Sequence, residues 1–215
     1  MNALDYSAII LTFSISLFIL ILAFLQIKKY KKTVDLKHSL FAYFLFSGSF
    51  GWGLIGLGFL CFNLNMESAG EIFAKMGAGF LNLTAVFSIS LFTYFANSDF
   101  VGISFFFGVL IFAVSLIAIS AEPLLFIDGD IICSAGQKLI FTLNALISTV
   151  LGLFFIIYAI KKLKGKLRRK VQFFGFGMLT LTLGTILTTL FENFYISTLF
   201  KIMIIVGVLL MYKSV

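Results

Sequence analysis

Three lysines, Lys75, Lys138 and Lys201, lie in or at the ends of long apolar segments and not in the basic connections of the chain. An ammonium group inside a bilayer is costly, about 2.5–3.5 kcal/mol at a helix centre on insertion scales, and charged residues there commonly mark binding sites. A lysine binds carboxylate oxygens through charge-assisted hydrogen bonds. These residues are therefore the first candidates for a ligand site.

Two asparagines extend the candidate site. Asn82 lies two helical turns after Lys75 on the same segment. Asn144 follows Lys138 on another apolar segment. We interpret Lys75, Asn82, Lys138, Asn144 and Lys201 as a shared outward-facing pocket for an anionic or carbonyl-bearing ligand.

The alternative is structural for each lysine. Glu71 precedes Lys75 by four residues, which is the spacing of a helix ion pair. Lys138 then caps a helix boundary, and Lys201 reaches the lipid headgroups. A Schiff base of Lys201 with retinal is disfavoured, because the apolar segments supply no carboxylate counter-ion at mid-membrane depth.

Catalytic and metal-binding patterns are not found in the sequence. The one histidine, His38, is expected at a surface position near a helix boundary. A zinc site needs a cluster of His, Cys or carboxylate ligands, and covalent catalysis needs a nucleophile beside a base. We therefore expect no enzymatic activity, no metal and no cofactor.

The elements that position these residues are membrane spans. The chain has 61% hydrophobic and 12% charged residues, against about 25% charged residues in soluble domains. A span needs about 20 apolar residues. Seven segments qualify, and they use nearly the whole chain as one domain, residues 1–215: residues 7–27, 39–62, 71–96, 100–120, 137–160, 171–191 and 196–212.

A basic connection fixes the orientation of these spans. Seven of the ten residues from 161 to 170 are basic: Lys161, Lys162, Lys164, Lys166, Arg168, Arg169 and Lys170. Basic connections stay on the cytoplasmic side, so the N-terminus is expected outside and the C-terminus in the cytoplasm of a multi-pass plasma membrane protein. We assign the cluster to the membrane surface and a protein partner, not to nucleic acid, because no interleaved aromatic residues accompany it.

The longest outer connection, residues 121–136, contains two features. Short apolar runs flank Asp128-Gly129, which is a two-residue hairpin signal, so a small outer β-hairpin is expected between the fourth and fifth spans. Cys133 in this connection and Cys61 at the end of the second span are both expected outside, where disulfides persist. A Cys61–Cys133 disulfide is one interpretation, and two free thiols are the other.

Small residues line two of the spans. They include Ser47, Ser49, Gly51 and Gly53 in the second span, and the sixth span has a similar series of glycines and threonines. Such residues let membrane helices approach closely, so packing within the bundle is expected, with a homodimer as the alternative.

The sequence resembles the N-terminal seven-helix input module of microbial sensor histidine kinases and related signalling proteins. The residues that carry the likeness are Gly51-Trp52-Gly53, the 73–77 and 91–95 stretches at the two ends of the third span, and residues 167–172 before the sixth. The resemblance implies sensing of a ligand or membrane state. No dimerisation helix, kinase or cyclase domain follows the seventh span, so action through a partner is expected.

The leading hypothesis is therefore a membrane-embedded sensory or adaptor module that detects an extracellular or membrane ligand. A structural accessory subunit of a larger membrane complex is one alternative, and a small solute transporter is another. A transporter of this size needs two similar halves, and no repeat of the first three spans is visible in the last three.

Overall fold

The structure is a computed structural model that describes residues 3–96, 100–121, 125–127, 130–132, 134–190 and 194–215. Within these residues the chain forms seven α-helices: α1 (Ala3–Thr33), α2 (Leu36–Asn63), α3 (Glu67–Ala96), α4 (Val101–Ala121), α5 (Ala135–Lys162), α6 (Gly165–Leu190) and α7 (Phe194–Ser214). Each is long and apolar enough to span a membrane. The prediction of a helical bundle with seven membrane-length helices is confirmed.

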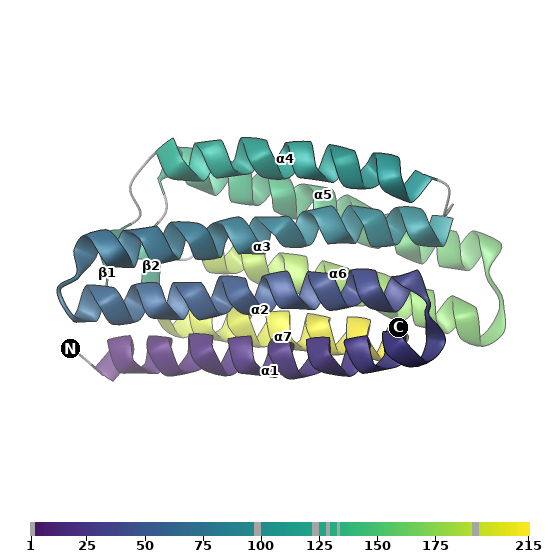
Figure 1. The fold of residues 1–215 in the computed structure, drawn as a ribbon, viewed down its shortest axis with the longest axis horizontal. Helices are drawn as coiled ribbons and strands as arrows, with labels where there is room; N and C mark the ends of the chain where they lie inside the picture. The colour runs from purple at the N-terminus through teal and green to yellow at the C-terminus, as the bar shows by residue number, and fades with distance from the viewer. Residues whose placement is uncertain (1–2, 97–99, 122–124, 128–129, 133, 191–193) are drawn as a thin grey trace.

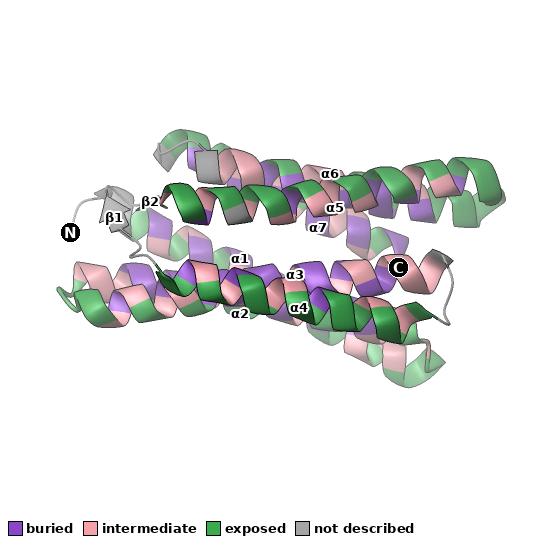
Figure 2. Cartoon of the chain, turned by 90° about the horizontal axis from the view of Figure 1, so that it is seen from above, coloured by how far each residue is buried: buried purple, intermediate pink, exposed green. Residues whose placement is uncertain are grey.

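The helices form two layers (Figure 1). One layer contains α1, α2, α3 and α4 in this order, and the other contains α7, α6 and α5; Figure 2 shows the two layers from above. Each helix packs mainly on a helix that is adjacent in the sequence. Less extensive contacts join α1 to α7 and α3 to α5. We call α1–α3 the first half and α5–α7 the second half of the bundle.

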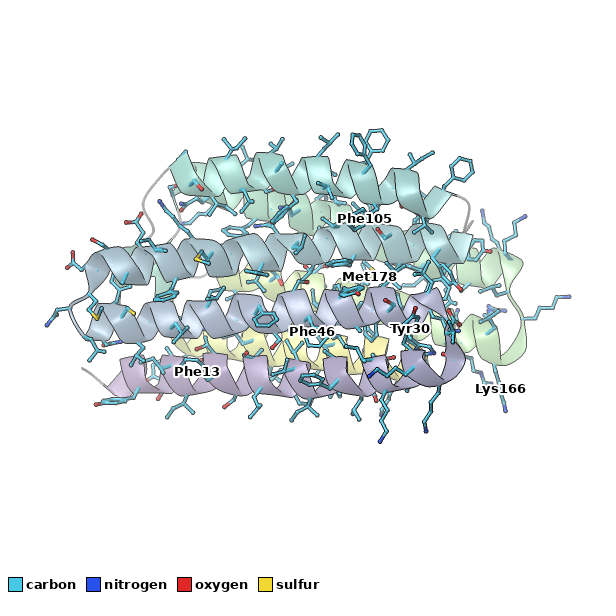
Figure 3. The ribbon with its side chains drawn as sticks, in the orientation of Figure 1. Phe13, Tyr30, Phe46, Phe105, Lys166 and Met178 are labelled. Atoms are coloured by element: carbon cyan, nitrogen blue, oxygen red, sulfur yellow. The ribbon has the colours of Figure 1, made fainter. Side chains whose placement is uncertain are left out.

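The two basic segments of the chain meet at one end of the bundle. The α1–α2 and α5–α6 connections and the C-terminus lie together there, and the N-terminus lies at the opposite end (Figure 1). We call these the basic end and the N-terminal end. Lys166 projects from the basic end (Figure 3), and all seven basic side chains of the 161–170 cluster are exposed.

Helices α1 and α6 extend beyond the predicted spans at the basic end. Helix α1 continues to Thr33, and α6 begins at Gly165, so most of the basic segments are helical rather than loop. A helix can continue past the apolar span into the water layer, because its backbone amide and carbonyl groups remain hydrogen-bonded to each other whether the side chains are apolar or polar. Gly165 has φ +60°, a left-handed conformation that suits the tight turn between α5 and α6.

Side-chain caps define two helix starts. The Asp35 carboxylate accepts a hydrogen bond from the Lys37 amide and caps α2. The Ser134 hydroxyl accepts from the Gln137 amide, while the Gln137 side chain accepts from the Ser134 amide, which is a capping box at the start of α5. These caps satisfy amide groups that otherwise lack partners in the first turn of a helix.

The small residues form close seams within each half. A Cβ at Gly77 would lie 2.7 Å from the carbonyl oxygen of Gly51, and a Cβ at Gly207 would lie 2.6 Å from that of Gly177. The interpretation of these residues as packing faces within the bundle is therefore confirmed, because the helix backbones touch at positions where only glycine fits.

The seam between α2 and α3 is repeated between α6 and α7. Seven residues after Gly51, a Cβ at Gly58 would lie 3.0 Å from the carbonyl oxygen of Gly70. Seven residues after Gly177, a Cβ at Gly184 would lie 2.8 Å from the carbonyl oxygen of Phe200. The partner residues are again seven apart in both halves. The two halves therefore share a packing pattern that the sequence did not reveal.

Two short strands lie in the connection between α4 and α5. Strands β1 (Leu125–Ile127) and β2 (Asp130–Ile132) pair antiparallel, with Phe126 opposite Ile131. The predicted turn at 128–129 lies outside the described residues. Cys133 also lies outside the described residues, so the disulfide with Cys61 stays a prediction; Cys61 itself is partly buried.

Candidate functional site

A cavity of about 170 Å³ lies between the two layers. Residues of both halves line it, and none of the described lining residues belongs to α4. The first half contributes Ile19, Phe44, Leu45, Gly48, Trp52, Ile55, Phe59, Ala74, Ala78, Leu81, Asn82, Thr84 and Ala85. The second half contributes Phe141, Asn144, Ala145, Ser148, Leu181, Thr182, Thr185, Thr188, Lys201, Ile204 and Val208.

The walls are mostly apolar, with a few polar groups among them. Trp52, Phe141, Ile204 and Val208 supply aromatic and aliphatic surface, and the lining extends toward the N-terminal end as far as Thr188. A largely apolar pocket with a small number of polar groups is typical of small-molecule sites.

An amide network bridges the halves beside the cavity. Asn144 of α5 donates hydrogen bonds from Nδ2 to Oδ1 of Asn82 on α3 and, over 3.2 Å, to Oγ of Ser115 on α4. Nδ2 of Asn82 donates to the carbonyl oxygen of Ala78 over 2.9 Å. The donors of Asn144 are therefore both used within the protein, which fixes the position of this part of the wall.

Lys201 is the charged residue of the cavity. It is 2% exposed in the isolated chain and lies on α7, where Ile204 and Val208 continue the same lining face. Thr182 of α6 is 1% exposed, and its hydroxyl has no hydrogen-bond partner among the described residues. A buried hydroxyl without a partner is unfavourable, so a bound water or ligand is expected to satisfy it.

Lys201 and the amide network share one depth in the bundle. Gly152 of α5 contacts Gly175 of α6. Asn144 lies eight residues from Gly152, and Gly184 lies nine residues from Gly175, both toward the N-terminal end. At 1.5 Å per residue Asn144 and Gly184 therefore lie at about the same height. Gly184 packs on the α7 backbone next to Lys201.

The structure separates the five predicted pocket residues. Asn82, Asn144 and Lys201 line the cavity, whereas Lys75 and Lys138 are not among its lining residues. Nζ of Lys75 lies 2.8 Å from Oε1 of Glu71 and 3.3 Å from the carbonyl oxygen of Ser120. For Lys75 the structure therefore shows the helix ion pair that the spacing also allowed. Lys138 is partly exposed in the first turn of α5.

Aromatic side chains fill the space between the halves on the basic side of the cavity. The rings of Phe155 and Phe174 lie 4.8 Å apart, and those of Phe92 and Phe155 lie 5.2 Å apart. Phe95 and Phe41 also pack against Phe174. We call these five residues the aromatic cluster. It joins α2, α3, α5 and α6, and it separates the cavity from the basic end.

Polar contacts join the start of α2 to the end of α3 at the basic end. The Asp35 carboxylate accepts a hydrogen bond from the Tyr94 hydroxyl over 3.0 Å and forms an ion pair of 2.6 Å with Lys37. Burial raises the pKa of the Asp35 carboxyl, but the hydrogen bonds from Lys37 and Tyr94 outweigh it, so this pKa lies below its ordinary value.

The surface position expected for His38 is wrong. The side chain is 6% exposed, and Nδ1 lies 3.0 Å from Oε1 of the fully buried Gln26. Helix α1 continues past Gln26 to Thr33, so this part of α1 covers the start of α2 and encloses the histidine.

Sequence reasoning missed two cavity residues of note. Neither Trp52, which lies in the Gly51-Trp52-Gly53 stretch, nor Thr182 is among the predicted ligand-site residues. The local signal for Thr182 is weak, because a threonine in a helix usually bonds to a carbonyl in the preceding turn, as Thr185 does with Leu181. Only the structure shows that the Thr182 hydroxyl makes no such hydrogen bond.

No protein-family model, curated protein sequence or solved structure matches this chain. Within the described residues, no group of three or more His, Cys, Asp or Glu side chains is placed to hold a metal ion.

Proposed function

We propose that this protein is a membrane-embedded sensory module that binds a small ligand in the cavity between its two halves. The observation that carries the proposal is the cavity itself, which has apolar walls and polar groups from both halves. A charged side chain inside a membrane segment is costly and is commonly retained for function, which favours a binding role for Lys201.

The basic end faces the cytoplasm in this proposal, and the N-terminal end faces outward. The positive-inside rule supports this orientation, because the α1–α2 and α5–α6 connections hold most of the basic residues and lie at the same end. The cavity then lies toward the outer side, and the aromatic cluster closes it from the cytoplasm.

The signal in this proposal is a small displacement of one half relative to the other. Helices pack extensively within each half, whereas the contacts between the halves, at α1–α7 and α3–α5, are less extensive. A ligand that touches both halves shifts their arrangement if it binds one arrangement more tightly than the other. The exposed basic cluster at residues 161–170 belongs to the second half and would present this shift to a cytoplasmic partner.

The resemblance to seven-helix input modules agrees with this proposal, since those modules act on a cytoplasmic output domain. The surface that receives the signal would be acidic, because the exposed cluster on α5 and α6 is strongly basic.

A small solute transporter is the second candidate, and the repeated seams favour it. Parallel repeats related by an axis along the membrane normal occur in transporters, with the substrate site between them near mid-membrane. The α2–α3 and α6–α7 seams repeat in this chain, and the cavity lies between the halves.

Mass spectrometry of small molecules that co-purify with the protein tests the proposal. The wild type is compared with Ala145→Leu, a variant that places a larger side chain in the cavity wall, where Ala145 is 6% exposed. We expect a molecule that is retained by the wild type and lost from the variant. Retention by both proteins would place the ligand elsewhere and refute the cavity as the site.

Flux measurements then separate the two candidates. The retained molecule is loaded into liposomes that contain the protein, and its efflux is followed. A sensor binds it without flux, whereas a transporter releases it at a rate that Ala145→Leu reduces. Stoichiometric recovery of other membrane subunits, with no small molecule bound, would instead favour a structural subunit.

A further inference from the structure

We propose that the ligand of the cavity is a neutral, largely apolar molecule that carries one hydroxyl group, such as a phenol or a cyclic alcohol. This inference rests on the proposed function, because it names the chemical class of the molecule that the cavity would hold. It is carried by a small hollow beside the cavity, by the hydrogen bonds of the residues that line this hollow, and by the size of the cavity.

A hollow of about 20 Å³ adjoins the cavity on its basic side. Thr84, Ser148 and Thr182 line both spaces. Ser88 and Met178, each one turn farther toward the basic end on α3 and α6, line the hollow but not the cavity. A space of this volume is large enough for one water-sized group. The hollow therefore extends the cavity by the room that a single polar group needs.

The polar residues of the hollow all carry hydroxyl groups. Thr84 and Ser88 come from α3, Ser148 from α5 and Thr182 from α6. We call these four residues the hydroxyl quartet. The other side chains that line the hollow, among the described residues, are apolar. The quartet is therefore a polar spot that both halves of the bundle supply, next to the mostly apolar walls of the cavity.

The hydrogen bonds of the quartet leave both acceptors and a donor for a ligand. The Thr84 hydroxyl donates to the carbonyl oxygen of Leu81, and the Ser88 hydroxyl donates to that of Thr84. Their hydrogens are used, so their oxygens can only accept. The Thr182 hydroxyl is almost fully buried and has no partner among the described residues, so it can donate.

A hydroxyl group on the ligand matches this arrangement. It donates to the oxygen of Thr84 or Ser88 and accepts from Thr182, whereas a carbonyl or carboxylate oxygen can only accept. Such a group connects α3 of the first half to α6 of the second half, which is the kind of contact that the proposed signal requires. Lys201 already has an interaction of its own within the protein, so no charge on the ligand is needed to satisfy it.

The size and lining of the cavity set the rest of the molecule. A cavity of about 150 Å³ accommodates benzene, and the cavity here measures about 170 Å³. The wall is aromatic or aliphatic at Trp52, Phe141 and Ile204. The apolar body is therefore about one ring in size, and it lies against this wall while the hydroxyl group enters the hollow.

Phenol and toluene test the hydroxyl group directly, because they differ only by a hydroxyl in place of a methyl group. Their affinities for the purified full chain are measured by titration calorimetry at neutral pH. Each variant is compared with the wild type for the same probe, so that partition of the probe into detergent cancels. Thr182→Val keeps the shape of the side chain and should weaken phenol binding about fivefold, the effect of one lost hydrogen bond, without weakening toluene binding.

Two further variants complete the test. Ser88→Ala removes an acceptor of the quartet and should also weaken phenol binding without weakening toluene binding, so it provides the test if Thr182→Val does not fold. Thr180→Val is the matched control, because Thr180 lies on the same helix, donates to the carbonyl oxygen of Phe176 and does not line the cavity or the hollow. It should leave both affinities unchanged.

The outcomes separate this inference from the proposed function. If toluene and phenol both bind, Ala145→Leu abolishes binding of both, and neither Thr182→Val nor Ser88→Ala affects phenol selectively, the cavity is a ligand site that does not select a hydroxyl group, and the inference is overturned. Equal weakening of both probes by Thr182→Val and by Ser88→Ala also overturns it. If neither probe binds to the wild type, the proposed function and the inference both fail.

Discussion

The most specific structural prediction concerns Gly207 in the α6–α7 seam. A Cβ at this position would lie 2.6 Å from the carbonyl oxygen of Gly177 and 2.6 Å from the amide nitrogen of Leu181. Both atoms belong to a helix backbone, so they cannot move aside as the end of a flexible side chain can. Gly207→Ala should therefore force α6 and α7 apart.

The size of the effect follows from two opposing terms. Alanine in a helix is favoured over glycine by about 1 kcal/mol. Overpacking of a close contact costs about 1–3 kcal/mol, and rigid backbone partners place this case at the upper end. We expect a net loss of about 2 kcal/mol, which lowers Tm by about 4–8 °C for a chain of this length.

Two glycines that lack such contacts provide controls. A Cβ at Gly102 has nothing within 4 Å, and a Cβ at Gly48 has its nearest neighbour at 3.8 Å. Gly102→Ala and Gly48→Ala should keep or slightly raise Tm, whereas Gly77→Ala in the repeated seam should lower it as Gly207→Ala does. Thermal unfolding in detergent, followed by Trp52 fluorescence, measures all four. Equal Tm values for Gly207→Ala and Gly102→Ala would refute the backbone seam.

Three further predictions concern the basic end. Asp35→Ala removes the capping carboxylate of α2 and should cost about 1 kcal/mol at neutral pH. The pKa of Asp35 is lower in the folded state than in the unfolded state. Its contribution to the free energy of unfolding is therefore complete above the unfolded-state pKa and is lost as pH falls through the folded-state pKa. Thermal unfolding measured over a series of pH values should show this loss in the wild type and not in the variant. Val34 has φ +53°, so Val34→Gly should raise stability by about 1 kcal/mol in the same assay, and no gain would contradict this strain. Lys166→Cys in a cysteine-free background should react with an impermeant maleimide only from the cytoplasmic side. Labelling from outside would mean that the basic end faces outward, opposite to the proposed orientation.

Hydropathy predicted the coarse architecture. The seven membrane-length helices and the packing of small residues such as Gly51 agree with the structure. These features depend on local composition and on side-chain size, which are read directly from a sequence. The Glu71–Lys75 ion pair is equally local, since both residues lie on consecutive turns of one helix.

The composition of the cavity could be predicted only in part. Whether Lys75, Lys138 or Lys201 lines the cavity depends on the rotation of its helix about its own axis, and that rotation is set by packing across the bundle. Helix α3 turns Lys75 toward Ser120 of α4, whereas α7 turns Lys201 toward the cavity. The periodicity of an almost uniformly apolar span does not distinguish these rotations.

The repeat between the halves was missed for a related reason. Gly58 meets the backbone of Gly70, and its counterpart Gly184 meets the backbone of Phe200. The contacted atom is a carbonyl oxygen in both halves, so the side chain at the partner position is free to differ. The contact repeats in space although the partner residues do not repeat in the sequence.

The central claim is that the cavity between the halves admits a ligand, and Trp52 offers a direct test of it. This residue is the only tryptophan in the chain and lines the cavity. Bromophenol and bromotoluene quench indole fluorescence on close contact through their heavy atom, so titration of each reports binding beside Trp52. We predict quenching that saturates for at least one probe in the wild type and disappears in Ala145→Leu. Quenching that rises linearly without saturation, or equally in both proteins, would contradict the account.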